Sequence, residues 1–185
     1  MSDSHLPPLS SDGVFSVSAS STINAPPEKV WAILLDFASY NECFNSRNPH
    51  VPKSRGQVVT DSSKQPLQSQ TPAEGQYLYI YPVHLPPTME KPGLFGESSA
   101  FVQITTLDHE NFRVAWNTAG LPHFLLHTER WQALSYDSIM KQTRYETIEV
   151  FGGLLAYFVN WFVRPKLVLG FQAMAEGLKR RAEQA

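Results

Sequence analysis

The spacing of hydrophobic and polar residues divides the chain into a short helical part, a strand-rich middle and a helical end. The first run alternates, because Phe15, Val17 and Ala19 are separated by polar serines, and this predicts a strand. Apolar residues then recur at helical spacing over 26–37, behind two prolines that suit the first turn of a helix. A second short helix is expected over 37–48, before the Asn-Pro pair.

The middle of the chain carries segments rich in β-branched and aromatic residues, separated by turn-forming residues. Tight turns are expected at 108–111 and 135–138, so the neighbouring strands should run antiparallel as a meander. The predicted strands are 56–60, 75–85, 99–108, 111–120, 123–134 and 138–151.

The last part of the chain, from Gly152 onward, is expected to form one long helix. Its apolar residues recur every three, four or seven positions, and Pro165 should bend the helix without ending it. Asn160, Arg164 and Lys166 interrupt this apolar run short of the ~20 residues that a spanning helix needs, so no stable membrane insertion is expected.

Composition adds limits on the class of protein. The 185 residues suffice for one domain with a core, assigned to 14–185, and 1–13 reads as a disordered polar tail without a signal sequence. The 15 basic and 17 acidic residues nearly balance, which disfavours nucleic acid as a partner. Cys43 is the single cysteine, so no intramolecular disulfide can form, and a cytoplasmic location is expected.

The order of predicted elements, together with four segments, resembles the SRPBCC superfamily. This superfamily is also called START-like or helix-grip, and it includes polyketide cyclase/dehydrase-like proteins, lipid-transfer domains and birch-pollen-allergen-like proteins. The resemblance implies an α+β fold in which a curved antiparallel sheet of six to seven strands wraps around a long C-terminal helix, with two short helices after the first strand. It also implies an apolar cavity between sheet and helix. The segments are 21–43, 48–49, 129–134 and 145–159.

Strand parity assigns residues to this cavity. If Trp131 and Phe151 face inward, as the resemblance suggests, then His127 and Glu129 face inward too, whereas Arg130 points to solvent. On the strand over 77–84, either the tyrosines or the alternate set that ends at His84 faces inward, and the second set is preferred because tyrosine tolerates water. The predicted lining comprises Phe44, Leu78, Ile80, Phe95, Trp116, Leu125, Trp131, Tyr145, Glu149, Tyr157, Phe158 and Trp161.

Three polar residues are candidates for acid/base chemistry. His127 and Glu129 would be neighbours on one strand face, and His84 would join them at a strand end. The favoured interpretation is that His127 and Glu129 are a buried polar pair that satisfies its own hydrogen bonds and has no catalytic role. No metal site is expected, because His123 and His127 would lie about 13 Å apart along a strand, too far for one ion.

Three functions remain open from the sequence. The first is binding of a hydrophobic small molecule of lipid, polyketide or terpenoid type. The second is a cofactor-independent cyclase or dehydratase that uses polar residues of the same cavity, since the sequence contains no phosphate loop, nucleophile elbow or HExxH motif. The third is a ligand-free interaction domain of co-chaperone type. The loop over 86–96 would either pack into the core or cover the mouth of the cavity.

Overall fold

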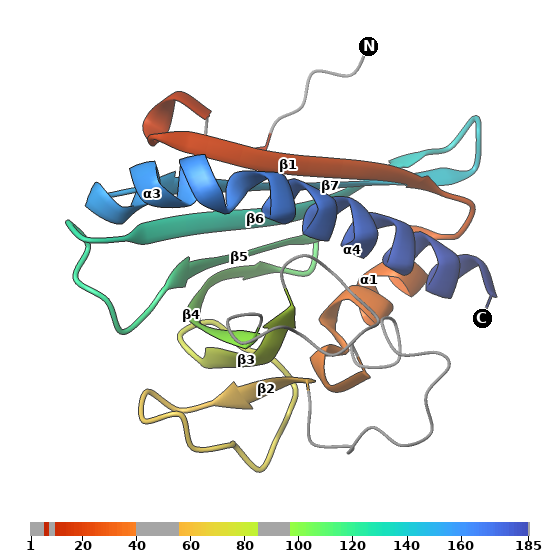
Figure 1. Cartoon of the computed structure of the whole chain (residues 1–185). Coiled ribbons are helices and arrows are strands. Elements are labelled where there is room, and N and C mark those ends of the chain that lie inside the picture. The colour runs from red at the N-terminus through yellow and green to blue at the C-terminus, as the bar shows by residue number, and fades with distance from the viewer. Residues whose placement is uncertain (1–5, 8–9, 40–55, 85–96, 185) are drawn as a thin grey trace.

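Seven strands rich in β-branched and aromatic residues pair into one antiparallel sheet (Figure 1). The computed structural model describes residues 6–7, 10–39, 56–84 and 97–184. The spatial order is β1-β7-β6-β5-β4-β3-β2, so the meander from β2 to β7 is completed by β1 beside the last strand. The strands are β1 (Phe15–Ile23), β2 (Gly56–Thr60), β3 (Tyr77–His84), β4 (Glu97–Asp108), β5 (Arg113–Thr118), β6 (His127–Asp137) and β7 (Gln142–Gly152).

The helices precede and follow this meander. In α1, Pro27 occupies the first turn, where its missing N–H is not needed, and Val30, Trp31 and Leu34 form the buried stripe. Most of the second short helix expected from the sequence lies outside the described residues, which end at Ser39 on that side. The helical elements are η1 (Ser10–Asp12), α1 (Pro27–Leu35), η2 (Phe37–Ser39), α3 (Leu154–Phe162) and α4 (Arg164–Gln184).

Helix α4 lies along the concave face of the sheet, mainly against β1 (Figure 1). The Ser21 hydroxyl on β1 donates to the carbonyl of Ala175 at 3.1 Å, which ties the helix to the strand. Leu178 and Ala182 on the next turns join the main hydrophobic core, and Phe171 joins a second cluster at the other end. Sheet and helix therefore form the two layers of a helix-grip fold, as the resemblance implied.

The prediction of one continuous C-terminal helix was wrong. The chain bends by 75° between α3 and α4, at Val163. Pro165 has no N–H to donate back into α3. It lies in the first turn of α4, where no such bond is needed, and does not kink a continuous helix. The first helical turn of α4 closes on Val163, whose carbonyl accepts from Lys166 and Leu167 at 2.9 and 3.0 Å.

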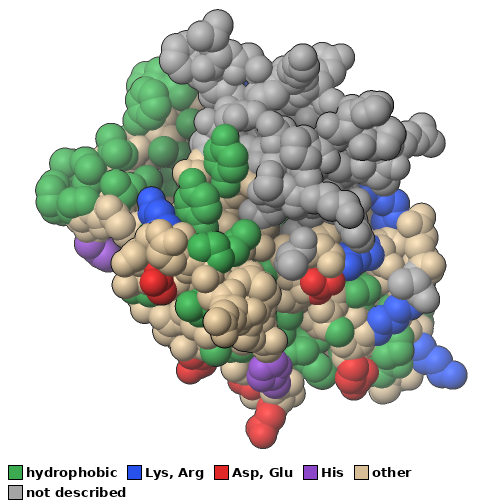
Figure 2. Space-filling model, turned by 90° about the horizontal axis from the view of Figure 1, so that it is seen from below, with side chains coloured by type: hydrophobic (Ala, Val, Ile, Leu, Met, Phe, Trp, Pro, Cys, Tyr) green, Lys and Arg blue, Asp and Glu red, His purple; other side chains and the backbone are tan. Residues whose placement is uncertain are grey.

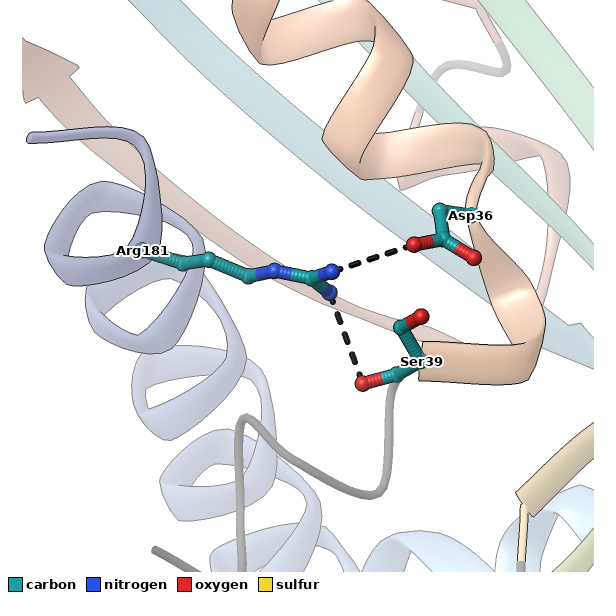
Figure 3. Close-up of polar contacts among 3 residues, drawn as sticks. All are labelled: Asp36, Ser39 and Arg181. Carbon is teal, nitrogen blue, oxygen red and sulfur yellow. Dashed lines mark hydrogen bonds and ion pairs between the residues drawn. The ribbon is translucent and has the colours of Figure 1, made fainter. Parts of the chain in front are cut away.

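Arg181 near the end of α4 fixes this helix to the first helical segment. Its guanidinium donates to Oδ2 of Asp36 at 3.0 Å and to the carbonyl of Ser39 at 3.4 Å (Figure 3). Asp36 directly follows α1, and Ser39 ends η2. The contact joins residues separated by more than 140 positions in the chain.

Two hairpin turns are closed by aspartates. Asp108 accepts from the backbone N–H of Glu110 and Asn111, so the turn between β4 and β5 follows the predicted position. The turn between β6 and β7 occupies 138–141, three residues later than predicted, and there Asp137 accepts from two backbone N–H groups. The position of this hairpin turn is set by the carboxylate of Asp137, which is a stronger acceptor for the turn N–H groups than the neighbouring serine and tyrosine side chains.

Candidate ligand-binding site on the concave face

The register between β6 and β7 decides which side chains face α4. Residues directly opposite each other share a face of the sheet, and Arg130 pairs with Glu149. Tyr145 is fully buried within the main core, so the odd-numbered residues of β7 face inward. The even-numbered residues of β6 therefore face inward with them: Thr128, Arg130, Gln132 and Leu134.

The predicted orientation of β6 was consequently wrong. Trp131 pairs with Ile148 and faces the convex side, where its Nε1 donates to Oε1 of Glu129 at 2.7 Å. His127 lies beside Gly152 on the same convex side, and a Cβ at that glycine would collide with the imidazole ring. The prediction took Trp131 and Phe151 to face inward together, as the resemblance suggests. Phe151 pairs with Thr128, so Trp131 lies on the opposite face and is half-buried there.

The segment before β6 is a turn and not a strand. The N–H of Leu125 donates to the carbonyl of Pro122 at 2.9 Å, and β6 begins only at His127. The rings of His123 and His127 stack with centroids 3.7 Å apart, so the strand spacing assumed for these histidines was wrong. Among the described residues, no three His, Cys, Asp or Glu side chains converge as metal ligands.

Arg130 is the central polar residue of the concave face. Its guanidinium carbon lies 4.1 Å from the ring centre of Phe171 on α4 and 5.7 Å from that of Trp116 on β5. Nε donates to the hydroxyl of Thr147 at 3.3 Å, and Nη2 lies 2.9 Å from Sδ of Met174. The cation is thus held between sheet and helix by aromatic faces and weak acceptors.

Glu149 faces the same space from β7. It is half-buried, and this desolvation raises the pKa of its carboxyl group, although the Arg130 charge and the Thr128 hydroxyl act in the opposite direction. Thr128 is itself buried, and its hydroxyl lies 2.7 Å from that of Thr118 on β5. Among the described residues, Arg130 takes part in no ion pair. Both charged groups therefore keep hydrogen-bonding capacity that the described residues do not use.

Within the described part of the chain, Gln132 leaves one buried donor without a partner. The Tyr145 hydroxyl donates to Oε1 of Gln132 at 2.6 Å, and burial raises the pKa of this tyrosine so that it stays protonated. Nε2 of the same amide has no hydrogen-bond partner among the described residues, although the side chain is fully buried. A buried amide N–H without a partner is energetically unfavourable, so this donor is available to a group that enters the site.

Apolar walls complete the site on the remaining strands. Trp116 is buried on β5, and its edge meets the ring of Phe37. Leu78 belongs to the buried core and Ile80 packs against it, so the preferred orientation of β3 was correct for these two residues. The pairing register shifts after Ile80, and the last side chains of the strand lie outside the described residues. The tyrosines of this strand lie on the convex side, where Tyr77 stacks on Phe101.

The aromatic residues expected from the start of the C-terminal helix do not reach this site. Tyr157, Phe158 and Trp161 lie on α3 and are exposed, and the 82% exposed area of Trp161 places it in solvent. The bend at Val163 directs α3 away from the sheet, so the inward orientation predicted for these three residues was wrong.

Some predicted residues cannot be placed. His84 ends β3, and its backbone pairs with Glu97, but its side chain lies outside the described residues. Phe44, Phe95 and the loop over 86–96 also lie outside them.

Sequence reasoning missed Thr128, Arg130 and Gln132 as a group. They occupy alternate positions in one strand, and this pattern is visible in the sequence. These positions alternate with Trp131, so the assumption that Trp131 faces inward assigned Arg130 to the solvent face.

The sequence matches no protein-family model and no curated protein. Solved structures match its fold. A hypothetical protein from Helicobacter pylori gives a TM-score of 0.63 at 16% identity, over 92% of this chain and 89% of that one. A protein from Thermus thermophilus gives 0.61 at 13% identity, over 90% and 96%.

A third match carries an enzyme name. It is a point mutant of norcoclaurine synthase from Thalictrum flavum, solved in complex with a transition-state analogue, with a TM-score of 0.58 at 10% identity over 91% of this chain and 94% of that one. At these identities the matches establish the fold alone. They confirm the helix-grip fold that the resemblance implied.

Proposed function

We propose that this protein binds a hydrophobic small molecule with an oxygen-containing polar group between the concave face of the sheet and α4. The observation that carries the proposal is the amide donor of Gln132, which is fully buried and has no hydrogen-bond partner among the described residues, on the face of the sheet that it shares with Arg130 and Glu149. Ligand sites typically combine apolar walls with a few convergent polar groups. A carbonyl, hydroxyl or carboxylate oxygen would accept from Gln132 and Arg130 while the apolar body contacts Trp116 and Phe171.

The chemical class of the ligand follows from this combination. An unsubstituted hydrocarbon would leave the Gln132 donor unsatisfied, and a small polar metabolite would not fill the aromatic walls. Oxygenated molecules of lipid, polyketide or terpenoid type meet both requirements. A protein of similar fold, norcoclaurine synthase from Thalictrum flavum, was solved in complex with a transition-state analogue, and this supports a small-molecule ligand for the present chain.

A second candidate function is acid/base catalysis on the bound molecule, and the raised pKa of Glu149 favours it. A carboxyl group whose pKa is raised holds its proton more readily and can serve as a general acid toward a bound molecule. Because His127 and Glu129 lie on the convex face, Glu149 is the described residue that would perform this step. No cofactor is required for cyclisation or dehydration by this route.

The proposal is tested by native mass spectrometry of the purified protein, followed by organic extraction of the bound species. We expect a mass shift from an oxygenated hydrophobic molecule in the wild type. Arg130→Met keeps the unbranched apolar stem but removes the charge, and it should weaken binding of the extracted molecule about tenfold or more, because a charge-assisted hydrogen bond contributes roughly 1.5–3 kcal/mol.

Arg144→Met is the matched control, since Arg144 is 46% exposed on β7 and bonds Glu146 away from the site. It should bind like the wild type. Glu149→Gln separates the two candidate functions, because a catalyst would lose turnover and still bind. If no small molecule binds the wild type, or if both arginine variants behave alike, the proposed site is wrong and the ligand-free interaction domain becomes the better hypothesis.

A further inference from the structure

The structure exposes an unusually apolar helix at one end of the molecule. Helix α3 contains no charged residue and buries only Ala156 among its nine residues. Figure 2 shows hydrophobic side chains gathered at the end of the molecule where Figure 1 places this helix. We call the exposed set the α3 surface, and it consists of Phe124, Leu154, Leu155, Tyr157, Phe158, Trp161 and Phe162.

The α3 surface is held in place by the turn before β6. The N–H of Leu154 donates to the carbonyl of Phe124 at 3.0 Å, and the N–H of Leu155 donates to that of Leu125 at 2.8 Å. These bonds satisfy two of the free donors at the start of the helix. Phe124 therefore stands beside the first turn of α3 and extends the apolar surface beyond the helix.

The exposed residues form a convex ridge. At 100° per residue, the exposed positions from Tyr157 round to Leu155 cover about 160° of the helix circumference. Phe158 and Phe162 approach with ring centres 4.7 Å apart, and Trp161 stacks beside Phe162 at 6.0 Å. A protein partner would need a groove shaped to this ridge, whereas fluid hydrocarbon adapts to any shape.

The charged residues that directly follow α3 in the sequence have one sign. Between Glu149 and Glu176 the sequence contains no acidic residue, while Arg164 and Lys166 follow α3 directly and are exposed. This arrangement complements a negatively charged surface. Tryptophan, tyrosine and phenylalanine on the apolar side with cations at the border are typical of helices that lie in a membrane interface.

From these observations we propose that the α3 surface docks the protein onto an anionic lipid bilayer, with α3 lying in the interface. Within the described residues no single helix is long and apolar enough to cross a bilayer, and α3 and α4 meet the requirement only as a pair bent by 75°. The bend suits attachment from one side: α3 enters the headgroup region while α4 stays on the sheet.

The test is flotation with vesicles of phosphatidylcholine, with and without phosphatidylserine, together with tryptophan emission. Trp161 is 82% exposed, so insertion should shift its emission to the blue. The variant with Phe158→Glu and Trp161→Glu should bind vesicles about tenfold more weakly or worse, because it places charge on the inserted face. Arg164→Gln and Lys166→Gln should each reduce binding to the anionic vesicles about fivefold.

The matched control is Ile139→Glu, which places the same charge on an 89% exposed residue in the turn between β6 and β7, at the opposite end of β7. It should bind vesicles like the wild type. All substituted side chains are exposed, and circular dichroism checks that each variant folds. The proposal is overturned if the wild type binds neither vesicle, if the glutamate variant binds unchanged, or if sedimentation shows a dimer that this variant dissociates while vesicles are not bound.

Discussion

At the scale of single residues, the concave face places charged groups where the sequence pattern suggested solvent or core. Arg130 contacts Phe171 and Trp116, and Glu149 faces it from the neighbouring strand. Each charge is partly desolvated, which a folded chain tolerates only when partners or a function compensate. The protonation of Glu149 is therefore the residue-level property that most directly reports on this site.

Stability should depend on pH through Glu149. Its pKa in the folded protein is raised above the ordinary value of 4.5, so the native state binds this proton more tightly than the unfolded chain does. The free energy of unfolding should then fall as pH rises from about 4.5 through the raised value, by at most about 1.4 kcal/mol per pH unit. Glu149→Gln should remove this loss. The free energy of unfolding of the variant should therefore rise relative to that of the wild type as pH increases above about 4.5.

Urea denaturation at a series of pH values measures this difference. Glu146→Gln is the control, because Glu146 lies on the same strand but bonds Arg144 away from the site. A constant difference between Glu149→Gln and the wild type from acid to neutral pH would show that the raised pKa is wrong.

At the scale of elements, a glycine pair decides how the last strand passes into α3. Gly153 has a φ of 91°, and a Cβ there would lie 2.8 Å from the carbonyl group of Leu125. Only glycine adopts this conformation without strain while the backbone of the preceding turn stays in contact. The same contact lets Leu125 accept from Leu155, so the position of α3 depends on it.

Gly153→Ala should lower the free energy of unfolding by about 2 kcal/mol or more, from left-handed strain plus the collision with Leu125. Gly177→Ala is the matched comparison. It lies inside α4 with open space around an added Cβ, so helix propensity should raise stability by about 0.5–1 kcal/mol. Urea denaturation of both variants provides the measurement, and equal effects would contradict the role assigned to Gly153.

At the scale of the whole molecule, the two ends of the chain meet on the sheet and beside the first helix. Strand β1 pairs with β7, and α4 packs along β1. Arg181 then joins the end of α4 to Asp36 after α1 (Figure 3). These contacts join segments that are distant in the chain. They should form late in folding, because bringing such segments together costs a large loop-closure entropy.

Arg181→Ala should lower the free energy of unfolding by about 1 kcal/mol or less, because both partners are partly exposed. A double-mutant cycle with Asp36→Ala isolates the pairwise part, which should shrink as salt is added. Denaturant unfolding at low and high ionic strength measures it. A coupling energy of zero at low salt would show that the contact between Arg181 and Asp36 does not hold α4.

The sequence by itself determined the order of most strands and helices, because period and turn chemistry act locally, but it placed neither the start of β6 nor the break between α3 and α4. The inward set of Leu78 and Ile80 and the helical stripe of α1 follow from it. Strand parity also correctly placed Tyr145 with Glu149 on one face. Strand alternation groups residues by face, but it does not show which of the two faces is buried.

Tertiary structure decided which face of β6 is buried and where the C-terminal helices separate. A shift of one residue in pairing exchanges the two faces of a strand, and only the register with β7 places Arg130 inside and Trp131 outside. Likewise, Pro165 permits either a kink or a new helix, and packing of α4 on β1 selected the new helix. Both the concave polar site and the exposed α3 surface arise from these two long-range choices, which local sequence patterns do not encode.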